Sequence, residues 1–162
     1  VGSNCYFISD VSHLTWLPDR PYTAGEWGYV NGKGRSTTSE IYNTVDGPVY
    51  QTWMEDITEY KIDAPAGTYE VELLMADVSR PARQQANLLG KGDERASAVS
   101  KRFDITSCGE VVEQNFSPAD NNRYLNACRR RYIVNNNDGC IDIRFTPLQG
   151  KPVLSGLKVR RL

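Results

Sequence analysis

The side chains that could carry out covalent or metal chemistry are few and scattered along the sequence. His13 is the only histidine, and the four cysteines are Cys5, Cys108, Cys128 and Cys140. A catalytic triad needs a base beside a serine or cysteine, and a zinc site needs clustered cysteines and histidines. The sequence contains no Gly-x-Ser-x-Gly motif, and "VNGKGRS" lacks the spacing of a phosphate-binding loop. We therefore expect no metal, no cofactor and no nucleophilic catalysis.

Carboxylates are the remaining candidates for catalysis. Glu55 adjoins Asp56, and Asp93 adjoins Glu94. A glycosidase uses two carboxylates set several ångströms apart in space, whereas adjacent acids are typical of solvated turns. A polysaccharide lyase would need a tyrosine or His13 beside an arginine or lysine in a groove. An enzyme is therefore the least favoured of three interpretations, after a carbohydrate-binding domain and a structural domain without a ligand.

Aromatic residues point to binding instead. The segment "PYTAGEWGYVNGKG", residues 21–34, holds Tyr22, Trp27 and Tyr29 among four glycines. A fixed aromatic ring can cover the apolar C–H face of a sugar while Asn, Asp, Gln or Arg pairs with its hydroxyls. Because Gly25 and Gly28 permit tight turning, we expect Trp27 to stand out from this loop and Tyr29 to pack beneath it.

The elements that would position these rings are strands. "TYEVELLMADV" alternates Tyr69, Val71, Leu73 and Met75 with Glu70 and Glu72, and "CIDIRFTP" and "PVLSGLKV" alternate likewise. Shorter candidates are "VYQTWM", "EYKID", "RFDI", "EVVEQNF" and "RRYIVN", separated by turn signals such as "DGP", "PAG", "NNNDG" and "PLQG". The pattern predicts an all-β, antiparallel β-sandwich of jelly-roll type. Residues 79–101 form a long excursion between strands, with a short helix expected around 84–89.

Length and charge set the general class. The 162 residues and the net charge of −1 suit a single domain, residues 1–162, with no overall field that attracts nucleic acid. The basic runs Arg129–Arg131 and Lys158–Arg161 are interpreted as solvated faces. No apolar stretch approaches the ~20 residues of a membrane helix. The start "VGSNCYFISD" has neither an initiating Met nor the features of a signal peptide, so we expect a domain cut from a longer or processed protein.

Four cysteines can form two disulfides in an exported protein or remain small buried thiols. A chain of this size does not need staples, which favours at least two free thiols. If a pair forms, we expect Cys108 with Cys140, because both begin predicted strands beside a glycine and the Cα atoms must lie within ~7 Å.

The order of several motifs resembles the malectin family of carbohydrate-binding domains, and most closely those appended to bacterial glycoside hydrolases of the β-galactosidase type. The motifs are the "EWGYVNGKG" loop, "VYQTW", "PAGTYEVELLMADV" and "PLQGKPVLSGLKV", which together span nearly the whole chain. The resemblance implies a jelly-roll-like sandwich that binds oligosaccharide in loops at one end and performs no catalysis. It also implies export to the periplasm, cell surface or medium.

The match to the family's binding residues is partial. An aromatic before a glycine in the first loop is matched by Trp27 and Gly28. The aromatic pair that follows "FAEV" in animal malectin is absent, because "MADV" is followed here by Ser79 and Arg80. An acidic residue before the last strand is replaced around residues 149–151. The family's sugar preference therefore does not transfer to this chain.

The site predicted from these observations consists of Trp27, Arg80, Tyr22, Trp53 and Asp77. The planar fork of Arg80 favours an acidic or sulfated polysaccharide, although Arg80 can equally pair with Asp77 or Glu72. We expect the isolated domain to be a monomer attached, in its parent protein, to a catalytic domain. The alternative is a structural domain without a ligand that packs against that catalytic domain.

Overall fold

The computed structural model describes residues 1–79, 100–120 and 123–162. The expected helix around 84–89 lies outside the described residues. Strands dominate, with a single four-residue helix among the described residues, α1 (Gly47–Tyr50). The strands are β1 (Phe7–Ile8), β2 (Thr15–Trp16), β3 (Trp27–Val30), β4 (Lys33–Ser36), β5 (Thr52–Glu55), β6 (Glu59–Asp63), β7 (Gly67–Met75), β8 (Arg102–Ser107), β9 (Glu110–Phe116), β10 (Cys128–Asn136), β11 (Cys140–Gln149), β12 (Val153–Leu154) and β13 (Gly156–Arg161).

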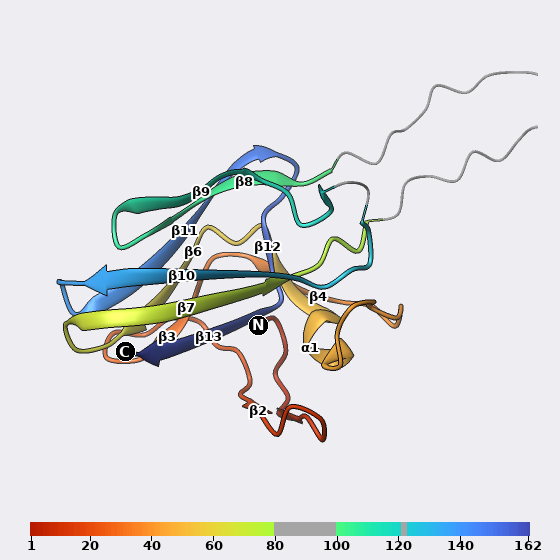
Figure 1. Cartoon of the computed structure of the whole chain (residues 1–162), viewed down its shortest axis with the longest axis horizontal. Coiled ribbons are helices and arrows are strands. Elements are labelled where there is room, and N and C mark those ends of the chain that lie inside the picture. Colours follow the sequence, from red (N-terminus) through yellow and green to blue (C-terminus); the bar gives the residue numbers. More distant parts are fainter. Residues whose placement is uncertain (80–99, 121–122) are drawn as a thin grey trace, which may run out of the picture.

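Two antiparallel sheets face each other and confirm the predicted sandwich (Figure 1). One has the strand order β3-β6-β11-β8-β9, and the other has the order β10-β7-β13. Their inner faces share one apolar core, to which β7 contributes Leu73, β8 contributes Phe103 and β11 contributes Ile143. Phe103 sets its ring edge-on to Phe116 and Phe145, with centroids 5.4 and 6.0 Å away.

The alternation read in the sequence is confirmed for β7 and β11. Tyr69, Val71, Leu73 and Met75 of β7 all lie in the core. In β11, the core receives Ile141, Ile143 and Phe145. Because side chains alternate between the two faces of a strand, Glu70 and Glu72 project to the outside of the sheet, where cationic side chains meet them.

Two strand predictions need correction. "VYQTWM" is not one strand, since Val49 and Tyr50 belong to α1, where Pro48 occupies the first turn, and β5 begins only at Thr52. "PVLSGLKV" is divided at the buried Ser155: β12 pairs with β5 in a third sheet, β12-β5-β4, and β13 pairs with β7. The chain crosses from one sheet to another at this point, so the two halves of the alternating segment pair with different strands, β5 and β7.

The pairing expected if a disulfide formed, Cys108 with Cys140, is wrong, because all four cysteines are free. The Cys108 amide donates to the Asp142 carbonyl at 3.1 Å, so Cys108 is level with Asp142 in the sheet. Cys140 lies two residues further along β11. At ~3.3 Å per residue and ~4.8 Å between strands, that offset separates the two by about 8 Å, beyond the ~7 Å limit for a disulfide.

The first nineteen residues form an arm with its own short sheet, in which β1 pairs with β2. Figure 1 shows this arm (red) below the sandwich, near α1. A second apolar cluster joins the arm to the sandwich: Phe7 and Trp16 pack against Tyr50 of α1 and Leu74 of β7. Among the described residues, no helix is long and apolar enough to cross a membrane.

Candidate functional site

The glycine-rich loop before β3 is fixed by backbone hydrogen bonds. The Tyr22 amide donates to the Tyr29 carbonyl at 2.9 Å, and the Tyr29 amide donates to the Arg20 carbonyl at 3.0 Å. Gly28 lies between them, and a Cβ there would meet the Arg20 carbonyl oxygen and would lie 2.6 Å from the Tyr22 nitrogen. The close approach of these two backbone segments therefore requires glycine at position 28.

Asp63, at the end of β6, fastens the tip of the same loop. Its Oδ2 accepts the Gly25 amide at 2.5 Å, and both carboxylate oxygens accept the Tyr22 hydroxyl at 3.0 Å. The Gly25 amide, and then the Cys140 thiol, hold the pKa of Asp63 below its usual value by stabilising the carboxylate. The same contact with Asp63 raises the pKa of Tyr22. The ionised carboxylate of Asp63 therefore holds the tip of the glycine-rich loop in place.

The position of Trp27 differs from the expected one. Trp27 is the first residue of β3, and it pairs with Ile62 of β6. Because residues two apart in a strand share a face, Trp27 and Tyr29 lie on the same side, and both pack partly buried against the core. The Arg20 guanidinium covers one face of the Trp27 ring at 4.4 Å from the centroid. The indole thus does not stand out from the loop.

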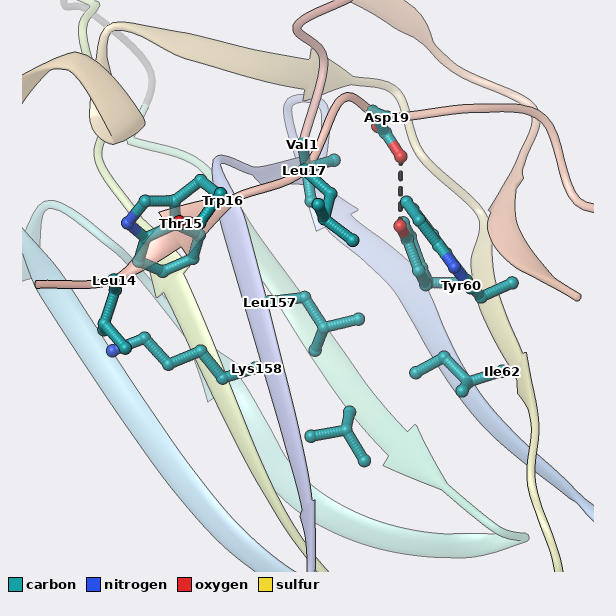
Figure 2. Close-up of a pocket in the computed structure, with 12 residues that line it drawn as sticks. Val1, Leu14, Thr15, Trp16, Leu17, Asp19, Tyr60, Ile62, Leu157 and Lys158 are labelled. Atoms are coloured by element: carbon teal, nitrogen blue, oxygen red, sulfur yellow. Dashed lines mark hydrogen bonds between the residues drawn. The ribbon is translucent and has the colours of Figure 1, made fainter. Parts of the chain in front are cut away.

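Instead, Trp27 lines a pocket at one edge of the sandwich, with a volume of about 340 Å³. Strands β3 and β6 form one wall, β13 forms another, and residues 14–19 of the arm close the third side. In the view of Figure 2, Trp16 and Leu17 of the arm lie above Leu157 of β13 and Ile62 of β6. Two tryptophans and several aliphatic side chains therefore enclose a concave, largely apolar space.

A few polar groups rim this pocket. The Tyr60 hydroxyl donates to Asp19 Oδ1 at 3.0 Å (Figure 2), and burial, followed by the charge of Asp19, raises the pKa of Tyr60 well above its usual value. Lys158 sets its ammonium 5.0 Å from the centre of the Trp16 ring. One anion, one cation and aromatic faces around a concavity match the general composition of a site for an amphiphilic small molecule.

Asp77 holds a different part of the chain. It follows β7, is fully buried, and its Oδ1 accepts Lys101 Nζ at 2.7 Å and the Ser79 amide at 2.9 Å. The Asp77 carbonyl also accepts the Leu125 amide at 2.9 Å. Asp77 therefore joins the start and the end of the 79–101 excursion, and its partner is Lys101.

The structure brings together only part of the predicted site. Tyr22 is hydrogen-bonded to Tyr29 of β3, the strand that Trp27 begins, but of the two predicted residues only Trp27 lines the pocket. Trp53 is buried in β5, with 7% of its surface exposed, and Asp77 is fully buried, so neither presents a free face. Arg80 lies outside the described residues. The alternative partner considered for it, Glu72, is paired with Arg131 and Lys158.

Sequence reasoning missed Trp16, Asp19, Tyr60 and Leu157 as pocket residues. Leu14 and Trp16 alternate in "HLTWLPD", a signal for a strand with an apolar face. The other pocket residues come from distant strands, and no local signal joins them. Among the described residues, no group of three or more His, Cys, Asp and Glu side chains is placed to hold a metal ion.

No protein-family model and no curated protein matches the chain. Among solved structures, the chain is similar over its whole length to part of a β-glucuronidase from Bacteroides uniformis, at 43% identity and a TM-score of 0.87, and covers 17% of that chain. It also matches the plant receptor-like kinase FER at 14% identity and a TM-score of 0.69, over 99% of this chain and 40% of that one. The ANX1 ectodomain from Arabidopsis thaliana matches at 16% identity and a TM-score of 0.68, over 98% of this chain and 46% of that one.

These neighbours define the class of domain. The two plant receptors share only the fold at such identities, and they confirm the resemblance to malectin-like domains that the sequence indicated. The β-glucuronidase match spans about a sixth of that chain. The present chain is thus similar to a small part of that enzyme, which indicates an appended domain without a catalytic role of its own.

Proposed function

We propose that this chain, a single domain over residues 1–162, is a non-catalytic carbohydrate-binding domain of an exported glycoside hydrolase, and a monomer when isolated. The observation that carries the proposal is the Trp16–Trp27 pocket in a domain 43% identical to an appended part of a β-glucuronidase. An accessory domain that binds glycan raises the local concentration of substrate near the catalytic domain to which it is joined.

In this proposal the sugar ring enters the edge pocket. The indoles of Trp16 and Trp27 cover its C–H faces, and Asp19 and Lys158 pair with its hydroxyls. Tyr22 adds an aromatic ring from the glycine-rich loop that precedes β3. Arg80 stays a predicted contact with the sugar. Trp53 and Asp77 are buried, so in this proposal they support the fold around the site and do not touch the sugar.

The proposed ligand is an acidic or sulfated polysaccharide. A β-glucuronidase acts, by its name, on glucuronides, which carry a carboxylate on the sugar, and this neighbour supports a ligand of the same charge. The pocket rim includes the cation Lys158, and Arg20 lies against Trp27. Both are suited to a carboxylate or sulfate.

The test begins with affinity gels that contain carboxylated, sulfated or neutral polysaccharides, followed by calorimetry on the polysaccharide that retards the domain most. Trp27→Ala should weaken binding ten- to hundred-fold, because stacking on one ring is worth ~1–3 kcal/mol and ~1.4 kcal/mol is tenfold. Tyr42→Ala is the matched control, since Tyr42 is an exposed aromatic that does not line the pocket. Equal affinities of the folded Trp27 variant and the parent would place the site elsewhere.

A second candidate function, a structural domain that docks on its catalytic neighbour, is favoured by the apolar surface of the N-terminal arm. Large apolar side chains are exposed there over a short span: Tyr6, Ile8, Val11, Leu14 and Leu17. Hydrogen bonds from Ser9 and Ser12 to Asp46 hold this surface against the sandwich. Exposed apolar patches of this kind mark interaction surfaces.

This candidate is tested in the parent multidomain protein. Ile8→Ser with Val11→Ser should lower the melting temperature of the whole protein and leave that of the isolated domain nearly unchanged. The control is Val111→Ser, at an exposed apolar position on β9 outside the arm. No difference between the arm variant and the control in the whole protein would exclude docking through the arm.

A further inference from the structure

The outer face of the β10-β7-β13 sheet gathers the two basic runs of the sequence. β10 and β13 lie on either side of β7, so residues 129–131 and 158–161 come together although they are far apart in the chain. The register sets Arg131 and Lys158 on the two sides of Glu72, and it sets Arg160 beside Glu70. The two runs, interpreted from the sequence as solvated faces, therefore share one face of the sheet.

Cations outnumber carboxylates on this face. Arg131 and Lys158 each lie 3.3 Å from Glu72, and Arg160 lies 3.3 Å from Glu70. Burial opposes the charge of Glu72, but Lys158 and Arg131 outweigh it and hold the pKa of Glu72 below its usual value. With Arg129, whose Nε donates to the Tyr50 hydroxyl, four cations face two carboxylates. The face keeps a positive excess at neutral pH.

The arginines of this face remain open to solvent. The side chain of Arg160 is 70% exposed, and that of Arg131 is 60% exposed. Their ion pairs occupy only part of the five N–H donors of each guanidinium, whose fork matches a carboxylate or sulfate. The exposed Arg160–Glu70 pair contributes little to stability, so exchange of Glu70 for an external anion costs the fold little. Glu72 is buried, but it keeps Lys158 when Arg131 turns to an external anion.

Lys158 joins this face to the pocket. Its ammonium lies between Glu72 of the face and the ring of Trp16, and the residue lines the pocket beside Leu157. Figure 2 shows Lys158 and Leu157 on opposite sides of β13, with Lys158 directed toward Leu14 and Trp16. A chain of sugars that fills the pocket can therefore continue over the edge of β13 onto the basic face.

We propose that this face, defined by Arg131, Lys158 and Arg160, binds the carboxylate or sulfate groups of an acidic polysaccharide whose neighbouring sugar occupies the Trp16–Trp27 pocket. The proposal rests on the proposed function and locates its anion-binding part. Cations two residues apart on a strand are ~6.6 Å apart, and β10 and β13 are ~10 Å apart. Such a grid fits repeated charges on a polymer and gives a monosaccharide only one contact.

The test compares variants of equal charge. Arg131→Gln with Arg160→Gln removes two cations from the face, and the control, Arg35→Gln with Arg144→Gln, removes two exposed, ion-paired arginines outside it. Binding to heparin and to polygalacturonate is measured from 50 to 300 mM NaCl. By the counterion release known for nucleic acids, the face variant should reduce the slope of log K against log salt by about two. Glucuronic acid alone should bind too weakly to detect.

Each outcome has a distinct meaning. Equal losses in both variants would show attraction to net charge alone and overturn the proposal. If the face variant has a lower melting temperature but binds as the parent does, the ion pairs have only a structural role, and the proposal is also overturned. If the parent binds a neutral glycan through Trp27 and no acidic one, the face proposal fails while the proposed function stands. If it binds no glycan, both fail.

Discussion

Asp63 and Asp77 each fasten a connection between strands, but they do so in opposite surroundings. Asp63 is half-buried at the end of β6 and accepts a backbone amide, a phenol and a thiol. Asp77 is fully buried, and Lys101, itself 7% exposed, lies against it. A carboxylate near water can be satisfied by neutral donors, whereas a buried one needs an opposite charge. The two residues should therefore respond very differently to the loss of a partner.

The largest effect is expected at Lys101. Lys101→Met leaves the Asp77 carboxylate buried without its cation and should lower the free energy of unfolding by about 3–5 kcal/mol. Urea denaturation measures the loss. The control is Lys61→Met, which removes a partly exposed lysine 3.7 Å from Glu59 and should cost under about 1 kcal/mol. Adding Asp77→Asn to the Lys101 variant should recover most of the loss, and no recovery would contradict the role given to charge.

An intermediate effect is expected at Gly28, on the Asp63 side of the comparison. Gly28→Ala forces the backbone of residues 20–22 away from β3 and should cost about 1–3 kcal/mol, as overpacking does. Gly47→Ala is the matched control, because no atom lies within 4 Å of a Cβ built there. Thermal unfolding of the two variants distinguishes them. Similar melting temperatures would mean that the loop adjusts freely.

A smaller effect concerns pH. Because the pKa of Asp63 is lower in the folded state than its usual 3.8, the unfolded state binds more protons between the two values. The stabilisation is therefore complete above pH 3.8 and is lost as pH falls through the folded pKa. Tyr22→Phe should raise the pKa of Asp63 toward its usual value without reaching it, since the Gly25 amide remains. Carboxyl NMR titration measures this, and an unchanged pKa would refute the contact.

The smallest effect is a rate of chemical modification. Burial, and then the hydrogen bond to Asp63, raise the pKa of the Cys140 thiol to about 11, so roughly one molecule in a thousand is the reactive thiolate at pH 8. Iodoacetamide labelling followed by mass spectrometry should modify the exposed Cys5 before Cys140. Asp63→Asn should accelerate labelling of Cys140 but not of Cys128. Equal rates at Cys140 in parent and variant would show that Asp63 has no influence.

The sequence by itself determined the class of fold and much of the strand layout. Period-two alternation is a local property of the chain, so the inner faces of β7 and β11 and the bounds of β6 (Glu59–Asp63) and β9 (Glu110–Phe116) were predictable. The motif order indicated the malectin-like resemblance for the same reason, since motifs are contiguous stretches of chain.

Only the tertiary structure decided which residues meet. Lys101 finds Asp77 across 24 positions, Trp16 of the arm shares a pocket with Trp27, and two distant basic runs flank β7. The change of sheet at Ser155 depends likewise on which strand lies opposite each half of "PVLSGLKV". Pairing between strands is set by packing over the whole core, and a local sequence pattern does not identify the strand with which a segment will pair. The sequence could therefore predict which types of residue form the site, but not which individual residues meet there.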